Sequence, residues 1–365
     1  MALLLKESGY HLSVVTPKIY QKSHYVEEQD GMRVYRFPFF SRNRLLIEYA
    51  KIPYFRMFCY YVTGFFLTVY VLLKHRCHLI HSHWAVPTGL IGVWVGTCFR
   101  TPHIVTIHGS DFRIAMTKIS ILKKVFLYVC KKAKHIICVS EVLKRDIEKL
   151  GINKDKISVF PMGVEEAFLN SLTNRGVNRL DQGFTILSNR QLEPIYNLSL
   201  LIRAIPIVLK QEPSAKFVIA GVGSERNNLQ RQVEDLNIDS WVQFLGWVIH
   251  EEMPALLSRV DIYVSTSLDD GTSVSLLEAM ASGAFPIVTD IPSNREWISD
   301  GENGFLVPID QEKCLAEKIV EAIRNEGLLE RSKQRNFRLI KEKALWPVTL
   351  AKTKEIYQSA LDSKS

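Results

Sequence analysis

Residues 260–308, VDIYVSTSLDDGTSVSLLEAMASGAFPIVTDIPSNREWISDGENGFLVP, decide how this chain folds. Residues 261–265 are rich in β-branched and aromatic side chains and predict a buried strand, and residues 285–289 predict a second one. Between these strands, apolar residues recur at helical spacing before a glycine, which predicts a helix over residues 273–281. A helical crossover of this kind joins parallel strands, so we expect an α/β protein.

The loop that precedes this helix, residues 267–273, is predicted to bind a ligand. In a doubly wound sheet, ligands lie beyond the carboxyl ends of the strands, where loops enter helix N-termini. Gly271 would let a ligand approach the backbone, and the first backbone N–H groups of the helix would form an anion or hydroxyl site. Asp270 and Glu278 add carboxylates that can accept sugar or ribose hydroxyls. The N–H groups belong to Thr272, Ser273 and Val274.

The segment DDGTSVSLLEAMASGAFPIV resembles the signature of family-4 retaining glycosyltransferases of the GT-B fold. That signature has two acidic residues, a glycine after the first, and an LLEAMA-G-P-V pattern around the second. The resemblance implies that Asp270 binds hydroxyls of the donor sugar and that Glu278 binds the ribose of the nucleotide. The family usually has glutamate first, so Asp270 is one methylene shorter. The alternative interpretation is an ordinary capped helix with a solvated Glu278.

Further matches to the family surround this signature. The family carries an arginine and a lysine that clamp the donor diphosphate; here the segment is SNRQLEPIYN, so Arg190 takes the arginine role and the lysine is missing. The segment GVGSER lacks the third glycine of a dinucleotide fingerprint, so we interpret Gly221 as part of a turn beside the donor site. The remaining donor-side positions that the resemblance implies are Gly246, Trp247 and Glu296.

Two histidines end predicted strands of the first half, at residues 78–83 and 103–108. The carboxyl end of such a strand faces the ligand. The family has a His-Gly pair at the end of the strand that corresponds to residues 103–108. This resemblance implies that His108 faces the donor sugar and that Gly109 allows close backbone approach. His83 is assigned to the acceptor side from its position alone. For each ring, the alternative is simple packing or exposure to solvent.

The length of 365 residues favours two domains. The resemblance implies two Rossmann-like domains that face each other across a cleft: an acceptor-binding domain over residues 1–165 and a nucleotide-sugar-binding domain over residues 166–344. A linker is predicted within residues 166–183, and a helix over residues 345–361 is expected to pack back on the first domain.

Charge is divided unevenly between the halves. The net charge of +8 is made up of +13 over residues 1–165 and −5 over residues 166–365. A basic half favours an anionic partner, and a membrane or lipid diphosphate fits better than nucleic acid because no nucleic-acid-binding motif is found. The uncharged residues 57–73 predict a buried or interface-lying helix, with shallow insertion or a transmembrane span as alternatives.

The resemblance implies a retaining hexosyltransferase (EC 2.4) that uses a nucleotide-diphosphate sugar as co-substrate. The basic first half and the apolar segment favour a lipid-linked saccharide as acceptor, in cell-surface polysaccharide synthesis. No metal-ligand cluster is visible, so neither metal nor cofactor is expected. Six cysteines without a CxxC pair indicate a reducing compartment, hence the cytoplasm or the inner face of the cell membrane. The alternatives are a soluble acceptor, a non-catalytic nucleotide-sugar-binding protein, or a truncated inactive homologue.

The resemblance also bears on the start of the chain. A family-4 chain opens with a strand and a Gly-rich loop before the helix that residues 2–8 resemble. That strand is central in a doubly wound sheet. We therefore expect a truncated version of a longer protein, with a gap or forced pairing between the strands at residues 11–16 and 78–81. Such a chain should be less stable and less active than one with the upstream segment.

Overall fold

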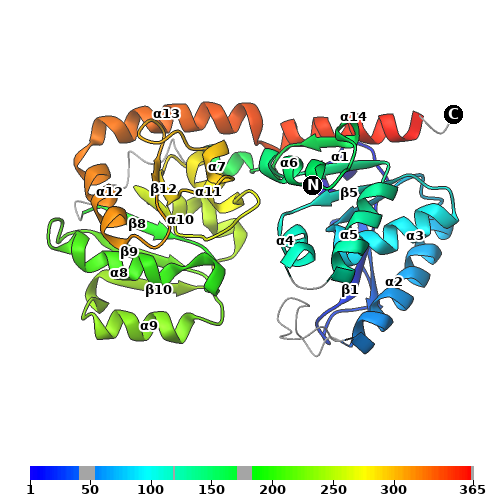
Figure 1. The fold of residues 1–365 in the computed structure, drawn as a ribbon, viewed down its shortest axis with the longest axis horizontal. Coiled ribbons are helices and arrows are strands. Elements are labelled where there is room, and N and C mark those ends of the chain that lie inside the picture. The colour runs from blue at the N-terminus through cyan, green and yellow to red at the C-terminus, as the bar shows by residue number, and fades with distance from the viewer. Residues whose placement is uncertain (41–53, 118–119, 171–182, 363–365) are drawn as a thin grey trace. The chain divides into compact units, whose positions relative to one another are not determined.

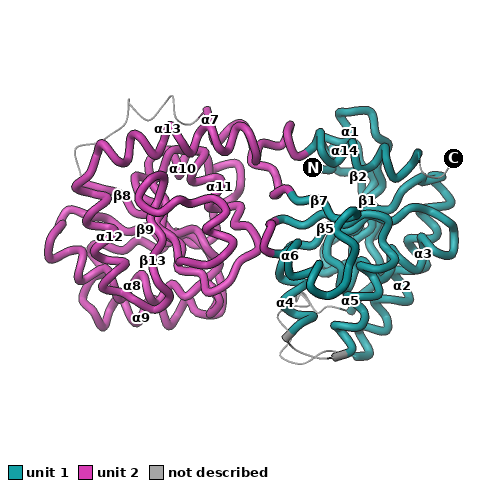
Figure 2. The backbone as a smooth tube through the Cα atoms, turned by 45° about the horizontal axis from the view of Figure 1, so that its top comes forward, with its two compact units in different colours: residues 1–139, 143–159, 350–365 teal, residues 140–142, 160–349 magenta. Residues whose placement is uncertain are grey.

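The computed structural model describes residues 1–40, 54–117, 120–170 and 183–362 and divides into two compact units (Figures 1 and 2). Unit 1 comprises residues 1–139, 143–159 and 350–365, and unit 2 comprises residues 140–142 and 160–349. Of the predicted linker, residues Glu166–Asn170 form helix α7, which lacks the length for a clear sequence period, and residues 171–182 lie outside the described residues.

The described strands of unit 1 form two sheets. One is three-stranded with the order β1-β3-β2, and the other is parallel and four-stranded with the order β4-β5-β6-β7. Their bounds are β1 Ser13–Lys18, β2 Val26–Gln29, β3 Met32–Pro38, β4 Ile80–His83, β5 His103–Ile107, β6 His135–Cys138 and β7 Ile157–Val159. No ladder joins β1 to β4 among the described residues. β2 is a charged and largely exposed strand without a clear apolar alternation, so the sequence did not predict it.

Helices cover the sheets of unit 1: α1 Ala2–Glu7, α2 Tyr54–Lys74, α3 Leu90–Cys98, α4 Ser110–Thr117, α5 Ser120–Lys132, α6 Glu141–Lys149 and the later part of α14 Trp346–Asp362. Helix α3 contains glycines, which weaken the helical signal in the sequence. The same glycines let the helix pack closely on β5, because a Cβ at Gly92 would lie 2.4 Å from His103 Nε2. Tyr357 of α14 contacts His81 of β4 at 2.6 Å, and its ring meets that of Tyr10 with centroids 5.9 Å apart.

Unit 2 is a parallel sheet with the order β10-β9-β8-β11-β12-β13. The strands are β8 Thr185–Ser188, β9 Lys216–Ala220, β10 Val242–Gly246, β11 Ile262–Ser265, β12 Phe285–Thr289 and β13 Phe305–Val307. The helices are α7, α8 Leu198–Leu209, α9 Arg226–Asp235, α10 Met253–Leu257, α11 Val274–Ala281, α12 Glu312–Arg324 and α13 Glu326–Lys343. The chain runs outward from β8 to β10 and then returns to β11 on the other side of β8. This reversal is a topological switch point, where doubly wound sheets bind ligands.

The segment that decides the fold adopts the predicted structure. β11 and β12 are buried along their full length and pair in parallel. Ser273 caps α11 by accepting a hydrogen bond from the Leu276 N–H at 3.2 Å. After the helix, Gly283 has a φ of +76°, a left-handed conformation that glycine adopts without strain. The unit β11-loop-α11-β12 is therefore confirmed and places its loop beside the switch point.

Candidate active site

A pocket in unit 2 lies where loops leave β8, β9 and β10 and meet α11. It is lined by Asn189, Arg190, Gln191, Ala220, Gly221, Val222, Trp247, Val248, His250, Met253, Ser275 and Glu278. Four of these residues are predicted from the sequence: Arg190, Gly221, Trp247 and Glu278. The others come from loops whose shape only the fold determines. Trp247 is 69% exposed, which leaves a large aromatic surface open to a ligand at the pocket.

Arg190, which follows β8, is buried against the loop before α11. Its Nη2 donates to Asp270 Oδ2 and its Nη1 to Ser273 Oγ, each at 2.5 Å. Burial alone would lower the pKa of Arg190, but the Asp270 carboxylate together with Tyr263 and Tyr196 outweighs burial, and the net shift is upward. Its Nε is buried without a hydrogen-bond partner among the described residues. The guanidinium is thus a permanent charge with one N–H group unused.

Tyr196, in the same segment as Arg190, packs against the guanidinium. Its ring centroid lies 4.4 Å from the Arg190 guanidinium carbon, a cation–π arrangement. The backbone oxygens of Tyr196 and Asn197 both accept from Thr266 Oγ1 at 2.9 Å, which ties this turn to the end of β11. The turn therefore holds an aromatic face against Arg190.

Glu278 on α11 is a carboxyl group at the pocket wall, only 6% exposed. His250 lies between two carboxylates, with Nδ1 3.9 Å from Glu278 and Nε2 3.4 Å from Glu165. Burial raises the pKa of Glu278 to about 7, His250 opposes that rise, and Glu165 adds to it. A ligand hydroxyl that donates to Glu278 would relieve the desolvation of its charged form.

Two glycine turns hold the pocket loops together. Gly221 has a φ of +150°, and a Cβ there would lie 2.3 Å from the Arg190 carbonyl oxygen. Its N–H donates to the carbonyl of Gly246, at a distance of 2.7 Å, and Gly246 itself has a φ of +72°. Both positions require glycine for backbone reasons, and Gly221 lets the β9 loop approach the arginine loop closely.

The other predicted donor residues do not line the pocket itself. Asp270 and Ser273 contact Arg190, and Asp270 Oδ1 also accepts from the Gly271 N–H at 3.0 Å. Thr272 and Val274 are neighbours of these residues at the start of α11. Glu296, in contrast, accepts hydrogen bonds from the backbone N–H groups of Glu141 and Val142 at 3.0 and 2.7 Å. Its carboxylate is therefore occupied by backbone donors in this structure.

In unit 1, the predicted histidines end neighbouring strands and contact each other. His83 Nδ1 and His108 Nε2 share a hydrogen bond of 3.0 Å, and the His83 ring also stacks on His81 with centroids 4.8 Å apart. Burial lowers the pKa of His83 and of His108 to about 4, and that of His81 well below its usual range. All three rings are therefore neutral near pH 7.

Asp111 organises the loop around these histidines, a role that the sequence analysis did not assign. Its carboxylate accepts from the Ala85 N–H at 2.7 Å and from the His108 N–H at 3.1 Å. Burial raises its pKa to about 6 even though these backbone donors oppose the rise. Gly109, between His108 and α4, has a φ of +93°, which suits a glycine. The HGSD sequence could have identified this aspartate as a loop cap.

Within the residues that the structure describes, no group of three or more His, Cys, Asp or Glu side chains is arranged to hold a metal ion. The ionisable side chains that line the pocket are instead Arg190, His250 and Glu278. A buried guanidinium suits a phosphate, and a carboxylate at a pocket wall suits a pair of hydroxyls. This combination matches the two ends of a nucleoside diphosphate.

Comparison with known families accounts for nearly the whole chain. Residues 1–168 match the family model described as Glycosyltransferase Family 4, and residues 172–338 match the model described as Glycosyl transferases group 1. The sequence is 26% identical over 325 residues to the UDP-Gal:alpha-D-GlcNAc-diphosphoundecaprenol alpha-1,3-galactosyltransferase of Escherichia coli, covering 84% of this chain and 78% of that protein.

Two further proteins are similar. The alpha-monoglucosyldiacylglycerol synthase of Streptococcus pneumoniae is 26% identical over 298 residues, covering 76% of this chain and 66% of that enzyme. Among solved structures, sucrose-phosphate synthase of Thermosynechococcus elongatus superposes with a TM-score of 0.80 at 16% identity, covering 99% of this chain and 91% of that one. At that identity the structural likeness concerns the fold alone, and it confirms the predicted GT-B architecture.

Proposed function

We propose that this chain, which belongs to the family-4 glycosyltransferases of the GT-B fold and is a hexosyltransferase, is a retaining enzyme that glycosylates a lipid-linked saccharide. The observation that carries the proposal is the pairing, in one pocket, of the buried Arg190 guanidinium with the buried Glu278 carboxylate. The first group suits the diphosphate of a nucleotide sugar, and the second suits the ribose hydroxyls.

In the proposed complex, the ribose hydroxyls donate to Glu278 and the diphosphate lies against Arg190 and the backbone N–H groups at the start of α11. The bond between the anomeric carbon and the phosphate oxygen breaks while the acceptor oxygen attacks from the same face. The departing diphosphate takes the proton of the acceptor hydroxyl, so no separate base is required. Developing negative charge on the diphosphate is stabilised by groups that are already oriented, which is the main electrostatic contribution of such sites.

The neutral histidines of unit 1 suit a different task. A neutral imidazole can donate to, or accept from, a sugar hydroxyl without placing a charge near the reacting carbon. We assign His108 to the donor sugar and His83 to the acceptor side. Asp111 holds the backbone of His108, and the hydrogen bond to His83 orients its ring.

The proposed acceptor is lipid-linked, and a cell-surface polysaccharide is the proposed product. Support comes from the basic charge of residues 1–165 and from the relatives in Escherichia coli and Streptococcus pneumoniae, whose names specify lipid substrates or products. Peripheral contact with an anionic membrane follows from the same charge. The six cysteines are free, which suits a reducing compartment such as the cytoplasm.

The decisive experiment is a screen of nucleotide sugars for thermal stabilisation, followed by transfer assays with the best donor and membrane lipid extracts. A ligand that binds only the folded state raises the melting temperature, and a labelled lipid product identifies the acceptor class. The anomeric configuration of the product, measured by NMR, tests retention. Turnover should persist in a chelator, because the proposed mechanism uses no metal.

Three results would contradict parts of this proposal. Tight UDP binding without turnover of any donor would favour a non-catalytic binding protein. Transfer to water-soluble sugars and to no lipid would contradict the proposed lipid-linked acceptor. Complete loss of turnover in a chelator, restored by a divalent cation, would remove the metal-free mechanism.

A further inference from the structure

Helix α2 (Tyr54–Lys74) has two opposite apolar faces, and one of them is packed into unit 1. On that face, the buried Tyr60 ring meets Phe37 of β3 edge-on, with centroids 4.9 Å apart. A Cβ at Gly64 would lie 2.6 Å from the side chain of Ile91 in α3. The helix is therefore held closely against both β3 and α3, as its position beside α3 in Figure 1 also shows.

The opposite face of α2 carries large apolar side chains that are exposed. Phe58 and Phe66 are 65% and 67% exposed, and both lie on the side of the helix away from Tyr60. The exposed stripe consists of Phe55, Phe58, Val62, Phe66, Tyr70 and Leu73, at intervals of three or four residues. A contiguous apolar patch of this kind normally marks an interaction site.

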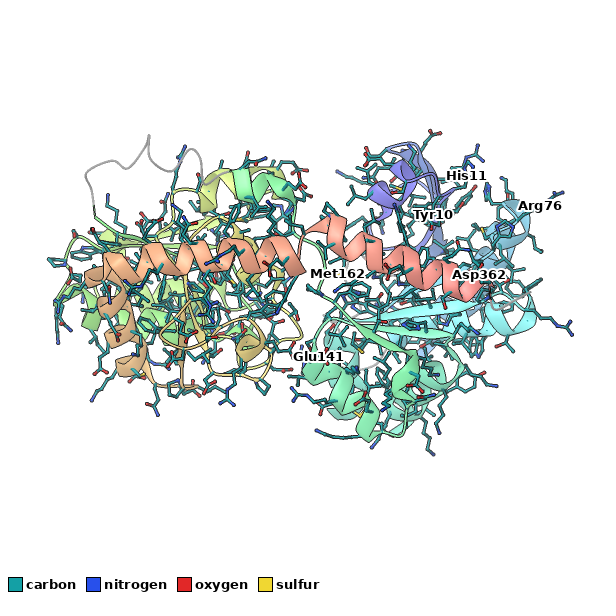
Figure 3. All side chains as sticks on the ribbon, turned by 90° about the horizontal axis from the view of Figure 1, so that it is seen from above. Tyr10, His11, Arg76, Glu141, Met162 and Asp362 are labelled. Carbon is teal, nitrogen blue, oxygen red and sulfur yellow. The ribbon has the colours of Figure 1, made fainter. Side chains whose placement is uncertain are left out.

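The stretch of sequence that contains the stripe carries charges of one sign. Between residues 49 and 110 the sequence contains five Lys or Arg and no Asp or Glu. At the C-terminal end of the stripe, Lys74 Nζ donates to the Tyr70 hydroxyl at 2.8 Å. Arg76 follows just after the helix and is exposed (Figure 3). An apolar, aromatic surface with a basic margin is complementary to an anionic lipid interface.

We propose that α2 lies in the plane of an anionic bilayer, with its exposed stripe inserted at the level of the headgroups and Lys74 and Arg76 contacting lipid phosphates. Among the described residues, α2 is the helix whose length and hydropathy would also allow it to cross a membrane. Crossing would, however, separate the Tyr60 and Gly64 face from β3 and α3. This inference deepens the proposed lipid-linked acceptor, because it keeps unit 1 where such an acceptor resides.

The inference is tested by flotation of the full chain with vesicles of phosphatidylcholine alone or mixed with phosphatidylglycerol. Wild type should float with the anionic vesicles, and high salt should weaken its binding. The double substitution Phe58→Glu, Phe66→Glu should reduce the partition coefficient by about tenfold or more, because two large side chains can no longer be buried in lipid. Phe58→Trp, Phe66→Trp should bind at least as well as wild type.

Matched controls are Tyr20→Glu in unit 1 and Leu236→Glu in unit 2, which charge exposed apolar positions outside the stripe and should leave flotation unchanged. Circular dichroism and the thermal shift with UDP check that each variant folds. Absence of wild-type flotation would overturn the inference, and so would resistance of the bound protein to alkaline carbonate, which indicates a span. If wild type does not bind vesicles but self-associates, and the double variant no longer self-associates, the stripe is a dimer interface.

Failure of this inference is distinct from failure of the proposed function. Transfer to a detergent-solubilised acceptor without any vesicle binding would remove the membrane role of α2 alone. Vesicle binding without turnover of any nucleotide sugar would leave the role of α2 intact and remove the proposed enzymatic function.

Discussion

The switch-point pocket of unit 2 and the histidine edge of unit 1 differ in how they treat charge. The pocket holds an arginine that stays ionised beside Asp270 and a carboxyl group, Glu278, whose pKa is raised to about 7 by burial. The edge holds rings that burial keeps neutral, such as His83 and His108 with pKa values of about 4. Both regions lie at the carboxyl ends of parallel strands, so the fold alone does not create this difference.

The difference suggests a division of labour. A departing diphosphate needs fixed charge, whereas hydroxyls of neutral sugars need only hydrogen-bonding groups. We therefore expect substitutions that change charge in unit 2 to have the largest effects on turnover. Substitutions that keep unit 1 neutral should have smaller ones.

The largest effect is expected for Arg190→Met, which removes the buried cation and keeps much of its volume. Loss of one preoriented charge-stabilising group lowers kcat by about 10²–10³. Arg190→Lys should recover only part of this loss, because an ammonium group cannot contact Asp270 and Ser273 with the same planar geometry. Steady-state kinetics measure the effect, with Arg203→Met on the exposed side of α8 as control. Equal kcat values for Arg190→Met and wild type would remove the charge role.

Glu278→Ala should have the second largest effect on turnover. Removing the ribose acceptor leaves buried hydroxyls of the donor unpaired, so we expect a loss of about 2–4 kcal/mol in kcat/KM. The donor KM and the UDP dissociation constant should both rise, since the nucleotide is bound before and during the reaction. Glu234→Ala on α9 is a suitable exposed control. Unchanged kinetics in a folded Glu278→Ala protein would show that this carboxyl does not bind the donor.

Asp270→Asn should have an intermediate effect. The amide preserves shape but withdraws the charge that keeps Arg190 in place, and we expect a loss of about 1–2 kcal/mol in kcat/KM. Asp270→Glu restores the residue type that the family usually carries. It keeps the negative charge and lengthens the side chain, so comparison with Asp270→Asn distinguishes the effect of charge from that of side-chain length. If the aspartate only caps its own loop through Gly271, both variants should keep wild-type activity.

A smaller effect is expected for His83→Phe. This change removes the 3.0 Å hydrogen bond to His108 but keeps an aromatic ring. Loss of one neutral hydrogen bond corresponds to about 0.5–1.5 kcal/mol, which should appear mainly in kcat. His135→Phe, which removes a similar bond to Ser158 away from this edge, is the matched control. A loss as large as that of Arg190→Met would end the proposed distinction between the two regions.

The sequence predicted what depends on local spacing. The strand, loop, helix and strand around Asp270 and Glu278 follow from periodicity and from glycine positions, and their bounds agree within a residue or so. The parallel α/β architecture follows from repeating that pattern along the chain.

What the sequence could not predict depends on contacts between distant segments. Arg190 and Asp270 are 80 residues apart, and only the neighbouring positions of β8 and β11 bring them together. The stack of Tyr196 on Arg190 and the position of His250 between two carboxylates arise in the same way. The exposed face of α2 was also undetermined, because a uniformly apolar helix does not reveal which side is packed. Short helix α7 and exposed strand β2 lack a clear period of their own.

The most direct test of the account is calorimetric titration of UDP at pH 7 in two buffers that differ in ionisation enthalpy. Folded Glu278 has a pKa raised to about 7 by burial, and hydroxyl donation from ribose favours its ionised form. UDP binding should therefore strengthen as pH rises through 7, and at pH 7 it should release up to about half a proton. In Glu278→Gln this release should vanish and affinity should fall. Equal affinity and equal proton exchange in wild type and Glu278→Gln would contradict the central claim that this carboxyl binds the nucleotide.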